Sequence, residues 1–95
     1  MKVKKLAPEE INFIVRLPNG DEYEVSASEQ ALAKELFEAV TEQKLIIVEL
    51  ESGESISYQM INKQMSKVIN MEESLAYNFI CEGSIIIITR HMVAG

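Results

Sequence analysis

Two stretches of this 95-residue chain carry the same pattern 33 positions apart. Residues 14–25 are IVRLPNGDEYEV and residues 47–58 are IVELESGESISY, with Ile, Val, Leu and Gly at the same four places. In each, an apolar run leads into a short polar segment that ends in glycine. Glycine accepts the positive φ that closes a three-residue β-hairpin loop. The repeat therefore predicts two β-hairpins, and it constrains the fold more than any other feature of the chain.

The first hairpin is predicted over residues 11–25. Its turn is Pro18-Asn19-Gly20, in which proline presets φ at the first position, asparagine tolerates the second and glycine closes the loop. On either side apolar residues alternate with polar ones, which places one set on a single face: Phe13, Val15, Leu17, Tyr23 and Val25. We expect this face to contribute to the core.

The second hairpin is predicted over residues 45–58. Its strands are 45–50 and 54–58, on either side of the turn Glu51-Ser52-Gly53. Gly53 would take the same left-handed conformation as the glycine of the first turn.

A helix is predicted over residues 28–43, SEQALAKELFEAVTEQ. Ser26 with Glu29 three residues later fits a capping box, and Ser28 is an alternative N-cap. One stripe of this helix is apolar and would dock on the hairpin: Leu32, Leu36, Phe37 and Val40. The opposite face of the helix is acidic.

Residues 60–82 fit two interpretations. Apolar residues recur there at roughly helical spacing, which favours a helical turn or two near 61–69. Residues 74–80 also alternate like a strand, so they are left open between helix and strand. Four consecutive isoleucines follow, Ile85, Ile86, Ile87 and Ile88, and they predict a strand covered on both faces. Such a strand is either central in a sheet or sealed by a subunit contact, because it would aggregate as an open edge.

These elements predict an α+β fold. It contains two β-hairpins each followed by a helix, in the order ββα-ββ(α)-β, with one mixed or antiparallel sheet packed on the 28–43 helix. In its element order the segment 11–72 resembles the ubiquitin-type β-grasp. The chain ends Val93-Ala94-Gly95 and lacks paired glycines, which speaks against conjugation.

Length and composition predict one soluble domain. We expect a single domain at 11–90, between a flexible lead-in at 1–10 and a frayed tail at 91–95. The longest apolar runs have four residues, far short of the ~20 that a membrane helix needs. The single cysteine cannot form an internal disulfide, so we expect a cytoplasmic protein with no membrane partner.

Charge is distributed unevenly along the chain. The net charge is −6, and residues 17–54 alone hold ten carboxylates against two lysines. A nucleic-acid-binding surface needs positive charge opposite the phosphates, so direct nucleic-acid binding is disfavoured. A protein partner, with a basic surface of its own, fits this charge better.

Residues suited to catalysis or metal binding are few. His91 and Cys81 are the one histidine and the one cysteine, and four scattered glycines form no phosphate-binding loop. Cys81 follows an isoleucine and is expected to be a small buried core residue. His91 is expected to be solvated near the end of the chain. We therefore predict no enzymatic activity, no cofactor and no metal.

The sequence thus predicts a small non-catalytic protein that binds another macromolecule, as an adaptor, regulator or inhibitor. The specific hypothesis is an acidic face directed at a basic partner, formed by Glu22, Glu24, Glu35, Glu38, Glu42 and Glu54. A homodimer through the isoleucine run is a separate prediction. The alternative function is a nucleic-acid-binding regulator that uses Lys2, Lys4, Lys5, Lys63, Lys67 and Arg90.

Overall fold

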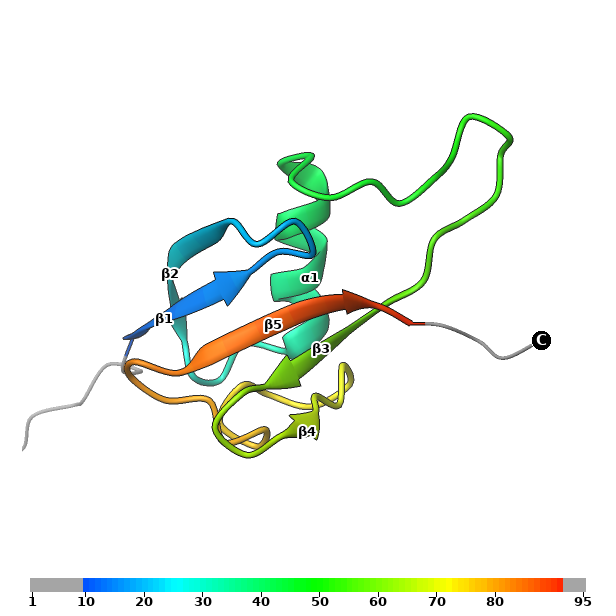
Figure 1. Ribbon diagram of the computed structural model, residues 1–95. Coiled ribbons are helices and arrows are strands. Elements are labelled where there is room, and N and C mark those ends of the chain that lie inside the picture. Colours follow the sequence, from blue (N-terminus) through cyan, green and yellow to red (C-terminus); the bar gives the residue numbers. More distant parts are fainter. Residues whose placement is uncertain (1–9, 92–95) are drawn as a thin grey trace, which may run out of the picture.

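The computed structural model describes residues 10–91. Its elements are β1 (Glu10–Arg16), β2 (Glu22–Ser28), α1 (Ala33–Glu42), β3 (Tyr58–Asn62), β4 (Lys67–Val68) and β5 (Ile85–Arg90). The strands form one sheet in the order β2-β1-β5-β3-β4, in which β1 and β5 are parallel and the other neighbours antiparallel. α1 packs across one face of the sheet (Figure 1). The predicted α+β class is confirmed, whereas the predicted lead-in and tail lie outside the described residues, apart from Glu10 and His91.

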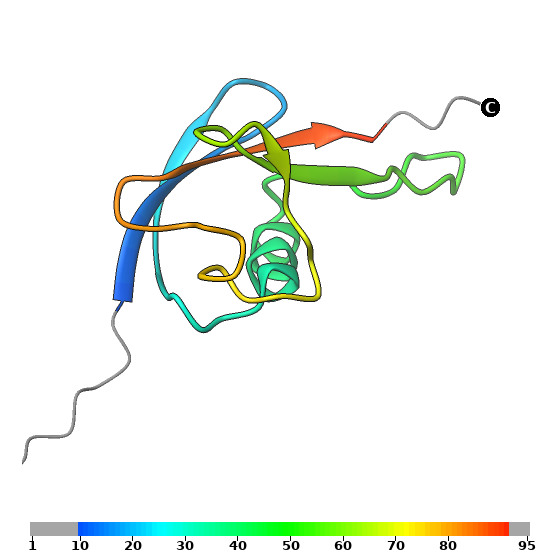
Figure 2. The same cartoon turned by 90° about the horizontal axis from the view of Figure 1, so that it is seen from below.

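The isoleucine run lies in β5, the middle strand of the sheet. β5 pairs with β1 on one side and with β3 on the other. Ile86 and Ile88 are completely buried in the core under α1, whereas Ile85 and Ile87 alternate with them and point to the opposite face. Within the described residues no helix covers that second face (Figure 2). Of the two alternatives predicted for this strand, the central position is confirmed, whereas the expected cover on both faces is wrong, because Ile85 and Ile87 are only partly buried.

The core lies between the sheet and α1. Strands β1, β3 and β5, the helix and the loops after β4 all contribute to it: Ile11, Phe13, Val15, Leu17, Ala33, Leu36, Val40, Met60, Ile69, Leu75, Ile80, Ile86 and Ile88. β2 lies at the edge of the sheet and adds only the partly buried Val25 and Ala27. Of the face predicted for the first hairpin, Phe13, Val15 and Leu17 are buried, whereas Tyr23 is 41% exposed.

The first hairpin forms as the sequence predicts. The Leu17 amide donates to the Asp21 carbonyl at 2.8 Å, and the Gly20 amide donates back to the Leu17 carbonyl at 2.9 Å. Gly20 has φ of +94°, which is the left-handed conformation required to close a three-residue loop. Seven residue pairs then join β1 to β2, from Arg16–Glu22 at the turn to Glu10–Ser28.

The second turn has the same geometry, but its arms do not join the sheet. The Leu50 amide donates to the Glu54 carbonyl and the Gly53 amide to the Leu50 carbonyl, both at 2.8 Å, and Gly53 has φ of +89°. The arms pair only at an isolated bridge, Glu49–Ser55, with one further bond from the Ile56 amide to the Val48 carbonyl. The predicted strands 45–50 and 54–58 are therefore wrong, apart from the Tyr58 at which β3 begins. Residues 47–57 extend away from the body, and we call them the projecting hairpin (Figure 1).

α1 begins five residues later than predicted, at Ala33. The predicted caps, Ser26 and Ser28, lie in β2 instead. The first amides of the helix are satisfied by backbone from a distant loop: Ala33 donates to the Glu73 carbonyl at 2.9 Å and Lys34 to the Met71 carbonyl at 3.0 Å. Such bonds replace a side-chain cap, so nothing local in the sequence marks the start of the helix.

The C-terminus of α1 is closed by backbone bonds that leave Lys44 in the left-handed conformation, with φ of +57°. The Leu45 amide donates to the Val40 carbonyl at 3.3 Å, and the Lys44 amide donates to the Thr41 carbonyl at 2.9 Å. These two bonds form a Schellman motif, in which the position of Lys44 is most often glycine. The chain therefore carries backbone strain just before the projecting hairpin.

The helical turns predicted near 61–69 are wrong. The segment contains β3, a tight turn and β4, with pairs Ile61–Val68 and Asn62–Lys67. Five residues of β3 also pair with β5, from Tyr58–Arg90 to Asn62–Ile86. Residues 71–79 form a series of turns, so most of the segment 74–80, left open between helix and strand, is neither. In the described part of the chain, α1 has ten residues, and no helix has the length and apolar character needed to cross a bilayer.

Candidate binding site

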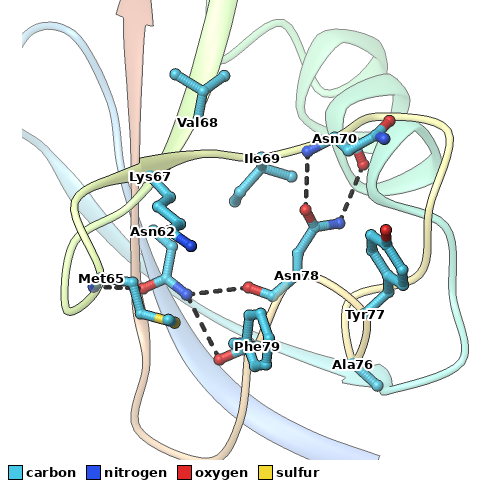
Figure 3. Close-up of a pocket in the computed structure, with 10 residues that line it drawn as sticks. All are labelled: Asn62, Met65, Lys67, Val68, Ile69, Asn70, Ala76, Tyr77, Asn78 and Phe79. Carbon is cyan, nitrogen blue, oxygen red and sulfur yellow. Dashed lines mark hydrogen bonds between the residues drawn. The ribbon is translucent and has the colours of Figure 1, made fainter.

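A pocket of about 540 Å³ lies between the β3–β4 turn and the loop at 70–79. Its lining residues are Asn62, Met65, Lys67, Val68, Ile69, Asn70, Ala76, Tyr77, Asn78 and Phe79, and we call it the loop pocket (Figure 3). Its volume is within the range of about 300–1,000 Å³ that is usual for ligand sites.

Two asparagines connect the two walls of the loop pocket. Asn62 is almost fully buried at the end of β3, and its amide nitrogen donates to the carbonyls of Asn78 at 3.0 Å and Phe79 at 3.4 Å. The Asn78 side chain in turn donates to the Asn70 carbonyl at 3.0 Å and accepts from the Asn70 amide at 2.8 Å (Figure 3). These side-chain hydrogen bonds take the place of backbone pairing between strands, and they hold an irregular loop in one conformation.

The same loop is bonded to the segment before α1. The Leu75 amide donates to the Ala31 carbonyl and the Ala76 amide to the Glu29 carbonyl, each at 2.9 Å. Together with the bonds that cap Ala33 and Lys34, they form a short irregular pairing between 29–34 and 71–76. The loop pocket is therefore fixed at the N-terminal end of α1 and is formed before any ligand arrives.

The rim of the loop pocket is apolar and exposed. Met65 is 41% exposed, Val68 61%, Tyr77 62% and Phe79 63%. These side chains are spaced around the rim, with the buried Ile69 between them (Figure 3). Large apolar side chains gathered on one surface at this exposure are typical of a site that binds another molecule.

Phe79 is held in an unfavourable backbone conformation. Its φ is +61°, a region in which a side chain costs roughly 1–2 kcal/mol and in which asparagine and glycine are favoured. The exposed ring gains little from the core, so folding alone does not account for phenylalanine at this position. Backbone strain of this kind is more frequent at functional sites.

The charge around the loop pocket differs between its two walls. Residues 58–70 contain Lys63 and Lys67 and no carboxylate, and of these two lysines Lys67 lines the pocket. Lys67 extends over the pocket beside Asn62 (Figure 3). The loop 70–79 contains Glu72 and Glu73, and the Glu72 carboxylate pairs with Lys34 at 3.5 Å. A ligand with both apolar and acidic groups suits this surface best.

Residues suited to catalysis are not brought together. Cys81 is exposed, so the prediction that it is buried is wrong; its Sγ lies 3.5 Å from Ser84 Oγ. His91 is exposed beyond the other end of β5, a six-residue strand that spans about 20 Å. Within residues 10–91, no three His, Cys, Asp or Glu side chains gather as metal ligands.

The six glutamates predicted to form one acidic face lie on three surfaces. Glu35, Glu38 and Glu42 are on the exposed side of α1. Glu22 and Glu24 are on β2, where they pair with Arg16 and Ile14 on the sheet face that points away from the helix. Glu54 is in the turn of the projecting hairpin. The Glu22 carboxylate is already bound to Arg16 at 2.9 Å. Binding by any of these residues stays a prediction.

The isoleucines of the predicted dimer contact are divided between two faces. Ile86 and Ile88 belong to the core of this chain. Ile85 and Ile87 are partly buried on the open face of the sheet, next to Ile14 and Ile61 in the pairing register. Only this second pair is available to a partner.

Comparison with known proteins identifies the fold. The β1–β2 hairpin, the parallel β1–β5 pair and the helix on one face of the sheet recur in solved ubiquitin-like domains. A protein designed on ubiquitin matches with a TM-score of 0.71 and 17% identity, covering 94% of this chain and 99% of that one. The ubiquitin-like domain of Plasmodium falciparum Dsk2 matches with a TM-score of 0.68 and 22% identity, covering 87% of this chain and 100% of that one.

A ubiquitin-like domain of Arabidopsis thaliana matches with a TM-score of 0.69 and 12% identity, covering all of this chain and 92% of that one. This chain has the ubiquitin-like β-grasp fold. The resemblance expected from the element order of 11–72 is confirmed for the fold. No family model matches the sequence, and no curated protein matches it. At these identities the ubiquitin-like fold is shared, and function must be argued from this chain's own surfaces.

The loop pocket was not predicted from the sequence. Its two rim aromatics, Tyr77 and Phe79, lie in a segment whose periodicity fits both helix and strand. Asn78 between them was the available signal for a turn, because asparagine side chains hydrogen-bond to nearby backbone groups in turns.

Proposed function

We propose that this chain is a non-catalytic protein-interaction module, and that it binds a segment of a partner polypeptide in the loop pocket. The observation that supports this most is the exposed Phe79 ring on a strained backbone. The ring forms one side of a rim that Tyr77, Met65 and Val68 complete. Aromatic side chains that a partner buries on binding contribute much of the binding energy of protein interfaces.

Lys67 defines the kind of segment that fits. The partner segment places an apolar side chain against the aromatic rim and a carboxylate beside Lys67. Opposite charge of this sort raises the association rate and makes binding depend on salt concentration. The ubiquitin-like fold, with its preformed pocket on rigid elements, supports binding without large rearrangement.

Selection from a library of displayed peptides tests this proposal. The full chain is the bait, and the Phe79→Asn variant is used for counter-selection. We expect enriched peptides to combine an apolar anchor with Asp or Glu, and to bind the variant at least about tenfold more weakly, the loss usual for a central aromatic. Peptides that bind both baits equally would contradict the proposal.

A matched control separates binding from backbone strain. Lys44 has φ of +57°, close to that of Phe79, and lies at the other end of α1. Lys44→Asn therefore relieves the same kind of strain without touching the rim, and it should leave peptide affinity unchanged. Exposed rings beside lysines also suit stacked bases. A saturable, Phe79-dependent titration with single-stranded oligonucleotide, without peptide enrichment, would overturn the polypeptide proposal in favour of nucleic acid.

The acidic side of α1 supports a second contact, with a partner that presents a basic surface. Within the described residues the ion pairs are Arg16–Glu22 and Lys34–Glu72, so Glu35, Glu38 and Glu42 have no ion-pair partner there. A bivalent module of this kind would act as an adaptor or regulator. Triple substitution of these glutamates by glutamine should abolish capture of such a partner at low salt. Capture that persists unchanged at high salt would contradict it.

A further inference from the structure

We infer that the loop pocket receives the projecting hairpin of a second copy of this chain, so that copies associate head to tail. This inference rests on the proposed function of the loop pocket and names its occupant.

The projecting hairpin exposes apolar side chains that its own chain does not cover. Ile47 is 63% exposed, Leu50 41% and Val48 36%. The two arms share one bridge and a few backbone bonds, and a hairpin of two strands alone is marginally stable in water. Contact with another surface would bury these side chains and stabilise the hairpin.

The base of the projecting hairpin is fixed to the domain. The Tyr58 hydroxyl donates to the Ile47 carbonyl at 2.5 Å, and the Tyr58 ring lies 6.2 Å from the Phe37 ring of α1. Val48 shares a shallow groove with Phe37 and Thr41. The hairpin therefore leaves the domain in a defined direction and presents its turn outward.

The two surfaces are complementary in charge as well as in apolar character. Residues 45–57 contain Glu49, Glu51 and Glu54 and no basic residue. In the loop pocket the charged lining residue is Lys67, whereas the loop 70–79 carries Glu72, which is paired with Lys34, and Glu73. Docking thus places Leu50 against the aromatic rim and the hairpin carboxylates near Lys67.

The geometry of α1 requires the contact to be between two molecules. The projecting hairpin follows the C-terminal end of α1, whereas the loop pocket is bonded to its N-terminal end through Ala33 and Lys34. The hairpin and the loops around β4 lie at opposite ends of the domain (Figure 1). Because donor and acceptor surfaces differ, the contact is heterologous, and repetition of it forms rings or open filaments.

Sedimentation velocity on the full chain tests this inference with two variants. A tip variant, Ile47→Ser with Leu50→Ser, removes the apolar side chains of the hairpin. A pocket variant, Phe79→Asn, removes the rim aromatic. We expect the wild type to gain mass with concentration, and each variant to remain at the 10.7 kDa monomer.

Mixing the two variants gives the decisive outcome. The tip variant keeps an intact pocket, and the pocket variant keeps an intact hairpin. In an equimolar mixture the hairpin of the pocket variant can enter the pocket of the tip variant, but the two remaining surfaces of that dimer cannot bind further copies. We expect the mass to double to that of a dimer and to rise no further. A mixture that stays monomeric overturns the inference. Association that survives in both variants also overturns it, and would assign the contact to the open sheet face with Ile85 and Ile87.

Charge variants provide a matched comparison. Glu51→Gln with Glu54→Gln should weaken self-association, whereas Glu10→Gln with Glu24→Gln, on the exposed side of β1 and β2, changes the net charge equally and should not. A wild type that is monomeric up to millimolar concentration, with peptides that still bind through Phe79, would remove this inference and leave the proposed function intact.

Discussion

The two hairpins of this chain share the same turn geometry, but only the first hairpin forms part of the sheet. Leu17, Gly20 and Asp21 form the same hydrogen bonds, at nearly the same distances, as Leu50, Gly53 and Glu54. Yet Leu17 is buried in the core, and Leu50 is 41% exposed at the end of a projection. The turn sequence decides how the chain reverses. Whether the arms become strands of the sheet is decided by the neighbours that they meet.

Those neighbours differ between the hairpins. β1 lies between β2 and β5, so the first arm of the first hairpin is paired on both edges. Among the described residues the first arm of the projecting hairpin has only its own return arm beside it, at the Glu49–Ser55 bridge. The same local pattern thus stabilises the fold in one place and presents an apolar surface in the other.

The largest expected effect compares the two equivalent leucines. Leu17→Ala removes a buried side chain and leaves a cavity, so we expect the free energy of unfolding to fall by about 2–5 kcal/mol. Leu50→Ala truncates an exposed side chain and should change it by less than about 0.5 kcal/mol. Urea denaturation of both variants measures the difference. Equal losses would show that the projecting hairpin is packed on the domain in solution.

A smaller effect is expected at the two glycines. An added Cβ meets no atom within 4 Å at Gly20 or at Gly53, so alanine costs only the backbone strain of a positive φ, about 1–2 kcal/mol. Gly20→Ala should lower global stability by this amount, because its hairpin is part of the sheet. Gly53→Ala should leave global stability unchanged and speed hydrogen exchange at the Ile56 amide, because the projecting hairpin opens locally. A global loss from Gly53→Ala would contradict the distinction.

The smallest expected effect concerns one cross-strand pair. Arg16 and Glu22 form an ion pair, and Glu49 and Ser55 occupy the equivalent positions of the projecting hairpin. Transplanting the pair, as Glu49→Arg with Ser55→Glu, should protect the hairpin amides by about 0.5 kcal/mol, which is usual for an exposed pair. Hydrogen exchange at Ile56 measures it. If Ser55→Glu alone slowed the exchange, the protection of the hairpin amides would not come from the ion pair.

The sequence predicted the features that depend on local chemistry. Glycine at the end of a polar turn indicates a hairpin because glycine adopts positive φ without the steric cost that a side chain adds, and Gly20 and Gly53 both have positive φ. The isoleucine run indicated a central strand because β-branched residues favour extended backbone. The ubiquitin-like order of elements followed from these signals and from the apolar stripe of α1.

Features that depend on distant partners were missed. The start of α1 is set by the carbonyls of Met71 and Glu73, some 40 residues away in the chain. The spacing of apolar residues around 61–69 fits a helix, but pairing of β3 with β5 imposes a strand. Phe79 has a positive φ, which is unfavourable for a residue with a large side chain. Such conflicts between residue type and backbone conformation concentrate at functional sites.

We propose that Phe79 serves binding at the expense of stability. Phe79→Asn tests it most directly, with unfolding and binding measured on the same preparation. We expect the free energy of unfolding to rise by about 1 kcal/mol, because asparagine tolerates positive φ, and the affinity for selected peptides to fall at least about tenfold. Loss of stability together with unchanged affinity would contradict the claim.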